Sequence, residues 1–410
     1  MKKFTLAVFL DHELNIGGNF QQSLNNIFLA KKLETLDYKV ITITTKKNNI
    51  KILKGLNIDC ILFNQNIISR ILIDLRESLP NYIYKILCIF SKKNILERFL
   101  DKLQVDLLYF VSQSPYASYV HSINYIYTLF DLCHRDNPEF PEVRHNRIFE
   151  FRETVFQKNL PRATAVLVDS ELGKKNVINR YRLDDNRVHI FPFRNSIFLD
   201  NNDKLKILDN NDEYIDIKKK YNLKSDYIFY PAQFWAHKNH FYILEALNIL
   251  QKEKDLSIAV IFSGSDQGNL SYIKNMTKKF KLENKVRFAG FVSSNEIKYL
   301  YLQSIALVMP TYFGPTNIPP LEAFKLGVPV FYPDLPGLRE QVGDAGLLLN
   351  LKDPRSLVNN LKKIFNSEQL KNSLIENGKA RYNSLTLDDT NFKILKNIID
   401  NFKFKRKTWK

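Results

Sequence analysis

Short apolar runs alternate along the chain with helix-length amphipathic stretches, and this alternation limits the fold more than any other feature. In the N-terminal half, strands are expected at Phe4–Leu10, Lys39–Thr44, Asp59–Phe63, Val105–Val111, Asn124–Leu129, Ala163–Val168 and Val188–Phe191. In the C-terminal half, strands are expected at Tyr227–Pro231, Ile258–Phe262, Val286–Phe288, Ile305–Met309 and Val328–Phe331. Apolar strands separated by helices are typical of parallel sheets with both faces covered. The pattern predicts an α/β protein with two doubly wound domains.

A polar region separates the two arrays. Residues Asn195–Asp226 contain two Asn-Asn-Asp clusters and the run Lys218–Lys220, which is typical of a linker. We expect an N-terminal domain at residues 1–195, a boundary region at 196–226 and a C-terminal domain at 227–385. Residues 386–410 are expected to form a helix and a basic tail, which could cross back to the N-terminal domain.

Composition restricts the class of protein. The 410 residues are 45% hydrophobic and 25% charged, which are globular values that exclude wholesale disorder and fibrous repeats. The three cysteines are far apart and form no CxxC pair, so neither a disulfide framework nor a zinc site is expected, and a reducing cytoplasm is the expected location. The apolar stretch Phe4–Leu10 ends at charged residues and is better explained as a strand than as a signal peptide.

The net charge of +17 favours anionic partners. Because the lysines are spread along the whole chain and the aromatic residues occupy apolar, periodic positions, we expect nucleotide phosphates or acidic lipid headgroups rather than nucleic acid. The sequence contains no run of 18 or more apolar residues, so we expect no transmembrane helix.

Loops that follow parallel strands are where open α/β sheets bind ligands. In the N-terminal half, Gly17 and Gly18 precede a helix and would let the backbone approach an anion, although a tight turn explains them equally well. After the strand Asn124–Leu129, the loop contains Asp131 and His134, and histidine is the common general acid or base near neutral pH.

Three further loops lie in the C-terminal half. Lys238 stands at a helix start, where the helix dipole disfavours a cation unless an anionic ligand binds there. Gly264 lies at another strand-to-turn junction. The longest loop runs from Met309 into a helix containing Glu322, an acid flanked by apolar residues that is costly to bury without a partner.

These motifs resemble retaining glycosyltransferases of family 4, also called glycosyl transferases group 1, which have the GT-B fold of two Rossmann-like domains facing a central cleft. The resemblance is clearest over Tyr227–Asp353. There "PPLEAFKLGVPV" is similar to the family's "LPxLEAMAxGxPV", "HKN" to its "RKN" donor-phosphate motif, and "VRFAGFV" to the segment that holds the base. "NIGGNF" and "DSELGKKNV" resemble segments of its N-terminal domain.

The resemblance implies a role for each matching residue. Glu322 would bind the ribose hydroxyls, and Lys238 would pair with the donor diphosphate. Asp131 and His134 would be the catalytic residues, acting at the acceptor side. The remaining donor-site residues would be Gly17, Gly18, Gln233, Gly264, Val292, Thr316, Asn317 and Ile318.

Three positions depart from the family pattern. Gly314 replaces the first acid of Glu-x7-Glu, which usually contacts the transferred sugar. Gln233 stands where many members have an arginine, so His237 or another group would have to neutralise part of the phosphate charge. Phe130 replaces the histidine of an "HD" pair, so either His134 and Arg135 would supply the missing function or the chemistry would be altered.

These residues predict an enzyme that transfers a sugar from a nucleotide-diphosphate sugar to a glycan or lipid-linked acceptor. The resemblance implies retention of anomeric configuration and a role in surface polysaccharide synthesis, such as O-antigen or capsule. Because lysine and helix-start amides can stabilise the leaving diphosphate and no Asp-x-Asp motif occurs, we expect no metal and no other cofactor. A non-catalytic nucleotide-sugar-binding protein and a nucleotide-sugar epimerase remain alternatives.

The C-terminal tail, Asn401–Lys410, contains five cations, three aromatic residues and no acid. Such a segment is expected to contact an anionic membrane surface at the inner face of the cytoplasmic membrane. An unattached basic tail is the alternative explanation.

Overall fold

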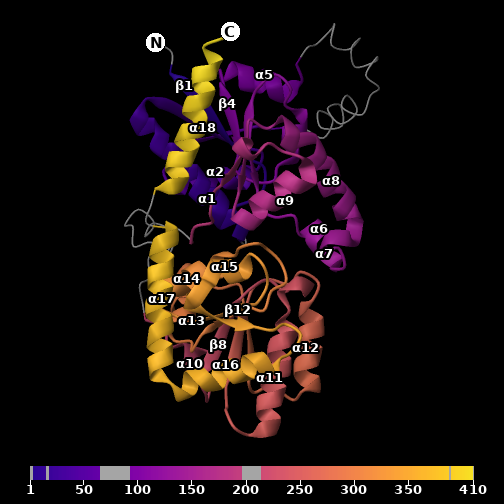
Figure 1. The fold of residues 1–410 in the computed structure, drawn as a ribbon, viewed down its shortest axis with the longest axis vertical. Coiled ribbons are helices and arrows are strands. Elements are labelled where there is room, and N and C mark those ends of the chain that lie inside the picture. The colour runs from indigo at the N-terminus through magenta and orange to yellow at the C-terminus, as the bar shows by residue number, and fades with distance from the viewer. Residues whose placement is uncertain (1–2, 15–17, 65–92, 196–213, 387–388, 410) are drawn as a thin grey trace. The chain divides into compact units, whose positions relative to one another are not determined.

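The computed structural model describes residues 3–14, 18–64, 93–195, 214–386 and 389–409. The chain divides into two compact units (Figure 1). Unit 1 comprises Met1–Phe130, Glu150–Pro192 and Asp389–Lys410, and unit 2 comprises Asp131–Phe149 and Phe193–Asp388. The segment Asp131–Phe149, which the sequence analysis assigns to the N-terminal domain, therefore packs with the C-terminal one.

Unit 1 is built on a parallel sheet with the strand order β3-β2-β1-β4-β5-β6-β7. Its strands are β1 (Phe4–Leu10), β2 (Tyr38–Thr44), β3 (Cys60–Leu62), β4 (Leu107–Phe110), β5 (Tyr125–Leu129), β6 (Ala165–Val168) and β7 (Val188–Ile190). Its helices are α1 (Gly18–Lys31), α2 (Lys47–Gly55), α5 (Ile95–Lys102), most of α8 (Ile148–Asn159), α9 (Glu171–Tyr181) and α18 (Thr390–Arg406). Every residue of β1, β4, β5 and β6 is buried, which is why these strands read as continuous apolar runs.

Unit 2 has a second parallel sheet with the order β10-β9-β8-β11-β12-β13. Its strands are β8 (Tyr227–Pro231), β9 (Ala259–Ser263), β10 (Val286–Gly290), β11 (Leu307–Val308), β12 (Val330–Pro333) and β13 (Gly346–Leu349). Its helices are α6 (Cys133–Asp136), α7 (Pro141–Arg144), α10 (Ile217–Lys220), α11 (His240–Glu253), α12 (Leu270–Lys279), α13 (Ser294–Leu302), α14 (Ile318–Leu326), α15 (Leu338–Val342), α16 (Arg355–Asn366) and α17 (Glu368–Thr386). The two parallel sheets confirm the predicted fold class.

Both sheets change direction at one point. The chain adds strands on one side of β1 and then continues with β4 on the other side, and it does the same at β8 and β11. At such a switch point the loops leaving neighbouring strands diverge, and the carboxyl ends of those strands form the usual ligand site. The fold therefore points to the loops after β1 and β4 in unit 1, and after β8 and β11 in unit 2.

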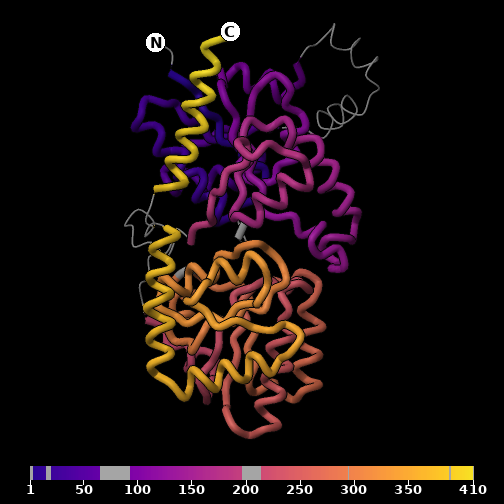
Figure 2. Tube along the Cα trace, viewed as in Figure 1, coloured from indigo at the N-terminus to yellow at the C-terminus, as the bar shows by residue number. Residues whose placement is uncertain are grey.

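The last helix, α18, is part of unit 1, whereas α17 before it belongs to unit 2. In α18, Phe402 is buried and contacts Phe4 of β1 edge-on, with ring centroids 6.1 Å apart, so the helix runs beside the first strand (Figure 2). Across the described residues, no helix is long and apolar enough to cross a membrane.

Candidate active site

The loops after β8 and β11 converge at the switch point of unit 2. The backbone amide of Tyr312 donates a hydrogen bond to the carbonyl oxygen of His237 at 2.9 Å. The Lys238 Nζ donates to the Asn317 Oδ1 at 3.4 Å. The sequence-predicted residues Lys238 and Asn317, 79 positions apart, are thus brought together at the carboxyl ends of neighbouring strands.

Lys238 ends a short 3-10 turn, Ala236–Lys238, and helix α11 follows from His240. Burial lowers the pKa of Lys238 to about 8, although the nearby Cys133, Asp131 and Glu142 oppose the shift. These groups do not fully compensate for taking the ammonium out of water, and a bound anion would offset the remaining cost. This environment supports the predicted role of Lys238 as a phosphate-binding group.

The start of α14 offers few free amides, because Pro319 and Pro320 in its first turn have none to donate. The Asn317 amide already donates to the Gln341 Oε1 at 2.9 Å. Ligand binding at the Asn317 amide would therefore require Gln341 to move. Thr316 and Ile318 flank it as predicted, and their roles as amide donors stay predictions.

Glu322 lies on α14 and is 8% exposed. The hydroxyl of Tyr301, a fully buried side chain of α13, donates to the Glu322 Oε2 at 2.9 Å. The sequence analysis expects ligand hydroxyls to satisfy this acid, whereas the structure shows that a protein hydroxyl already contributes. A role in ribose binding stays a prediction, and it would have to coexist with this buried pair.

The backbone conformation at Gly314 is unfavourable for a residue with a side chain. Gly314 has φ +91°, a conformation that residues with a Cβ rarely adopt. A Cβ built at this position would lie 2.9 Å from the carbonyl oxygen of Thr316. The loop would have to change its conformation to accommodate the glutamate that the family pattern has at this position.

Gln233 and Gly264 lie where the loop after β8 contacts the loop after β9. The Gln233 side chain accepts a hydrogen bond from the Trp235 indole at 3.1 Å and donates to the Ser265 hydroxyl at 3.3 Å. At Gly264, φ is +147° and a Cβ would approach the Ala232 carbonyl oxygen to 2.4 Å, so only glycine fits. Both residues shape the site in the structure, and direct donor contacts by them stay predictions.

The predicted base-binding segment follows β10. Val292 is partly buried against the core of unit 2, whereas Phe291 is among the most exposed large apolar side chains of the described residues. An exposed ring at a strand end is suited to stacking on a base, and Val292 supports the turn.

His237 cannot supply the positive charge that the departure at Gln233 calls for. Burial lowers its pKa to about 4, despite the opposing effect of the Glu142 carboxylate. Its ring is therefore neutral near pH 7 and stacks on Phe313 with centroids 4.0 Å apart. In the loop after β8, Lys238 is therefore the side chain that supplies positive charge.

The two predicted acceptor-side residues lie on the segment Asp131–Phe149. The Asp131 Oδ1 accepts a hydrogen bond from the Cys133 amide at 2.9 Å, and its charge acts on Lys238. His134 is fully buried and contacts Phe149 edge-on at 5.5 Å. This burial favours a packing role for His134, and its catalytic role stays a prediction.

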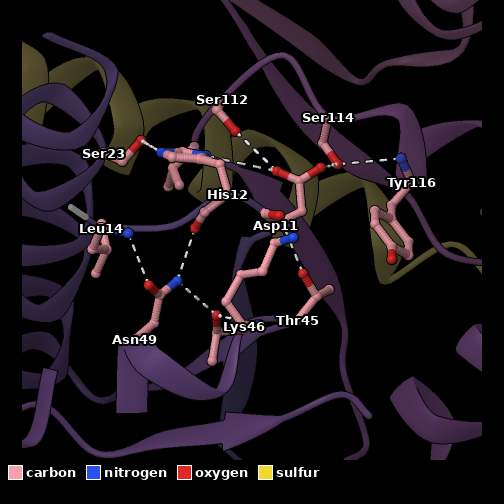
Figure 3. A network of polar contacts seen from close by, with 12 residues as sticks. Asp11, His12, Leu14, Ser23, Thr45, Lys46, Asn49, Ser112, Ser114 and Tyr116 are labelled. Atoms are coloured by element: carbon pink, nitrogen blue, oxygen red, sulfur yellow. Dashed lines mark hydrogen bonds and ion pairs between the residues drawn. The ribbon is translucent and has the colours of Figure 1, made fainter. Parts of the chain in front are cut away.

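In unit 1, Gly17 lies outside the described residues, and Gly18 is the first residue of α1. The switch point between β1 and β4 contains a polar cluster that the sequence analysis did not identify (Figure 3). Ser112 and Ser114 donate to the two carboxylate oxygens of Asp11 at 3.3 and 2.7 Å. His12 and Ser23 lie within hydrogen-bonding distance, at 3.2 Å. The polar residues that follow β1 and β4 in the sequence are the signal from which this cluster could have been predicted.

Glu142 is the other site residue that the sequence analysis missed. Its Oε1 accepts hydrogen bonds from the backbone amide of His237, at 2.8 Å, and from the His237 ring. No pattern could indicate this contact, since 95 positions separate the two residues. Within the described parts of the chain, no three His, Cys, Asp or Glu side chains are grouped to bind a metal ion.

Comparison with known proteins identifies the C-terminal domain. Residues 212–381 match the family model described as glycosyl transferases group 1. The O-antigen chain mannosyltransferase RfbU of Salmonella typhimurium is 27% identical over 56% of this chain and 58% of its own length. The O-antigen chain mannosyltransferase B of Escherichia coli is 29% identical over 34% of this chain and 37% of its own. The match thus spans less than two thirds of the length of each of these curated relatives.

Solved structures extend the likeness in fold to both units. A glycosyltransferase from Rickettsia africae superimposes with a TM-score of 0.69 at 16% identity, covering 98% of this chain and 100% of its own. Anabaena Alr3699/HepE in complex with UDP-glucose gives 0.68 at 15% identity, covering 97% and 99%. The chain therefore shares the fold of these structures over both units, and its residues 212–381 match the model of glycosyl transferases group 1.

Proposed function

We propose that the protein transfers a sugar from a nucleotide-diphosphate sugar to a glycan or lipid-linked acceptor in surface polysaccharide synthesis. The main support is the meeting of Lys238 with the start of α14 at the switch point of unit 2, in a domain of glycosyl transferases group 1. The names of the O-antigen mannosyltransferase relatives favour a mannose donor and a polysaccharide acceptor.

The proposed chemistry depends on charge stabilisation. When the glycosidic bond to the diphosphate breaks, negative charge grows on the leaving group. The Lys238 ammonium would stabilise this charge, and amides near the start of α14 would add to it, without a metal. Retention of the anomeric configuration is part of the proposal by resemblance to the family.

For the acceptor we propose the polar cluster around Asp11 in unit 1. A carboxylate and an imidazole beside serine hydroxyls can bind sugar hydroxyls as hydrogen-bond acceptors and donors. The position of this cluster at the switch point of the first sheet supports that role.

The function is tested with the purified protein, first with nucleotides alone and then with donor and acceptor. The melting temperature of the protein is measured with UDP, GDP and ADP. The nucleotide that belongs to the donor should raise it, because a ligand that binds the folded state stabilises that state. The protein should then release that nucleotide from its mannose or glucose conjugate when a polysaccharide or lipid-linked acceptor is added. This release should continue in excess EDTA. Absence of binding and release with every donor would refute the proposal, and activity abolished by EDTA and restored by Mg²⁺ or Mn²⁺ would refute its metal-free chemistry.

We also propose that the C-terminal tail docks on anionic membranes. Phe404 is 71% and Trp409 49% exposed, whereas Phe402 is buried and Arg406 is paired with Asp106 at 3.1 Å. The exposed side chains of the tail therefore include Phe404, Lys405, Lys407 and Trp409, which we propose as the docking surface. Truncation after Asp400 would also remove the core residue Phe402, so substitutions are the better test.

Charge reversal at Lys405 and Lys407 is expected to weaken sedimentation with anionic vesicles about tenfold or more, since each cation near an anionic leaflet contributes about 1 kcal/mol. Reversal of the exposed pair Lys51 and Lys54 on α2 serves as the charge-matched control. Binding should weaken with salt and be absent with neutral vesicles. Equal loss in both double variants would show that only net charge matters and that the tail has no specific role.

A further inference from the structure

The segment Asp131–Phe149 is anchored to the donor-site loops of unit 2 by apolar contacts. Phe140 meets Phe313 edge-on at 5.1 Å and Tyr312 at 5.3 Å. Cys133, Val143 and Phe313 form a buried cluster beneath these rings. The segment is therefore a packed part of this site and not merely a connection between β5 and α8.

Glu142 projects from this segment onto the loop that contains Lys238. Its Oε1 accepts from both the backbone amide and the ring Nδ1 of His237, and the side chain is 6% exposed. Burial alone would raise the pKa of Glu142, but these bonds outweigh it and lower the pKa, so the carboxylate is charged. Because the neutral His237 ring donates from Nδ1, its Nε2 carries the lone pair.

The second oxygen of Glu142, Oε2, is buried and has no hydrogen-bond partner among the described residues. Its charge is therefore not offset by a further donor, and it acts on the Lys238 ammonium. The other groups that raise the pKa of Lys238, both with a larger effect than Glu142, are the Cys133 thiol and the Asp131 carboxylate from the same segment. The rings of His237 and His240, both with pKa values lowered by burial, are neutral neighbours.

We propose that Glu142 is a positioning residue of the donor site: it fixes the His237 ring in the Nδ1–H tautomer and, by accepting from the amide next to Lys238, places a buried carboxylate beside the loop that would bind the diphosphate. The second half of this inference rests on the proposed function. It explains how a site without the family's arginine keeps a cation in a poorly hydrated loop. It also gives the segment Asp131–Phe149 a role in donor binding.

The tautomer is tested by nitrogen-15 NMR of histidine-labelled protein, with the His237 signal assigned from a His237→Gln variant. Wild-type protein should show His237 protonated at Nδ1. Glu142→Gln retains a carbonyl acceptor and should keep this tautomer, whereas Glu142→Ala should shift the ring toward protonation at Nε2. An Nε2–H ring in wild-type protein, or an unchanged ring in a folded Glu142→Ala variant, would overturn the positioning role.

The charge effect is tested by calorimetric titration of UDP, GDP or ADP, whichever stabilises the wild-type protein most, between pH 6 and 9. Affinity should fall as pH rises through the Lys238 pKa. In Glu142→Gln, loss of the negative charge lowers that pKa, so the fall should begin at a lower pH than in the wild-type protein. Below pH 7, affinity should stay within a few-fold of wild type. Glu139→Gln, an exposed acid of the same segment, is the control and should leave the profile unchanged.

The outcomes separate this inference from the proposed function. A wild-type protein that binds none of the three nucleotides contradicts the function, and the NMR result still decides whether Glu142 fixes the ring. Normal wild-type binding with the same pH midpoint in Glu142→Gln overturns the charge role while leaving the function intact. A variant that only melts at lower temperature, with an unshifted midpoint, likewise shows a structural role alone.

Discussion

Replacing Lys238 by alanine is expected to reduce donor turnover by about 10²–10³-fold, the usual cost of removing one group that stabilises developing negative charge. The ammonium lies at the meeting of two strand-end loops, and burial lowers its pKa to about 8. Loss of a partly desolvated cation should not destabilise the fold, because its removal also removes a desolvation cost. Steady-state release of the nucleotide, with melting temperature measured in parallel, checks both expectations.

Two variants make the Lys238 result specific. Lys252→Ala removes an exposed lysine from α11 and should leave turnover unchanged. Lys238→Arg should retain partial activity and lose the decline above pH 8, since a guanidinium stays charged where an ammonium with a pKa of about 8 does not. Near-normal turnover in folded Lys238→Ala would remove the central residue from the proposed site.

The second large effect is expected at Glu322. If its carboxylate accepts two ribose hydroxyls, Glu322→Ala should weaken donor binding by tenfold to more than a hundredfold, since hydrogen bonds to charged groups contribute about 1.5–3 kcal/mol. The structure adds an effect on stability, because the variant leaves the buried Tyr301 hydroxyl without this acceptor. Unfolding free energy should therefore fall by about 1–3 kcal/mol.

Tyr301→Phe separates these two effects. It removes the donor to Glu322 without altering the acid, so it should lower stability while donor affinity stays within a few-fold of wild type. Glu322→Gln keeps the size and one acceptor oxygen, and should lose affinity with less loss of stability. Equal loss of donor binding in Tyr301→Phe and Glu322→Ala would mean that the buried pair supports the site only indirectly.

The fold could be predicted from the sequence because most strands are buried on both faces. Phe4–Leu10 and Tyr227–Pro231 were expected with their observed bounds, and other strands shift by one or two residues. The edge strand β13 (Gly346–Leu349) was missed. Four residues at a sheet edge give too short an apolar run to differ from a turn, and only pairing with β12 makes them a strand.

The candidate site could be predicted in part. Lys238 and Asn317 were expected from strand-end position and family resemblance, and the structure brings them together. The Tyr301–Glu322 pair and the Glu142–His237 contact could not be expected, because neither pair shares a helical or strand spacing. Which carboxylate faces which donor depends on packing between separate elements.

The sequence by itself determined the two doubly wound domains and the resemblance of the C-terminal one to glycosyl transferases group 1, because each follows from local periodicity or from contiguous motifs. Only the tertiary structure decided that Asp131–Phe149 packs with the C-terminal domain, that His237 is neutral and that Gly314 has a backbone conformation unfavourable for an acid. The physical reason is that burial, charge coupling and backbone conformation depend on neighbours far away in the chain. Such neighbours set the pKa of Lys238, while the sequence sets only its place at the end of a strand.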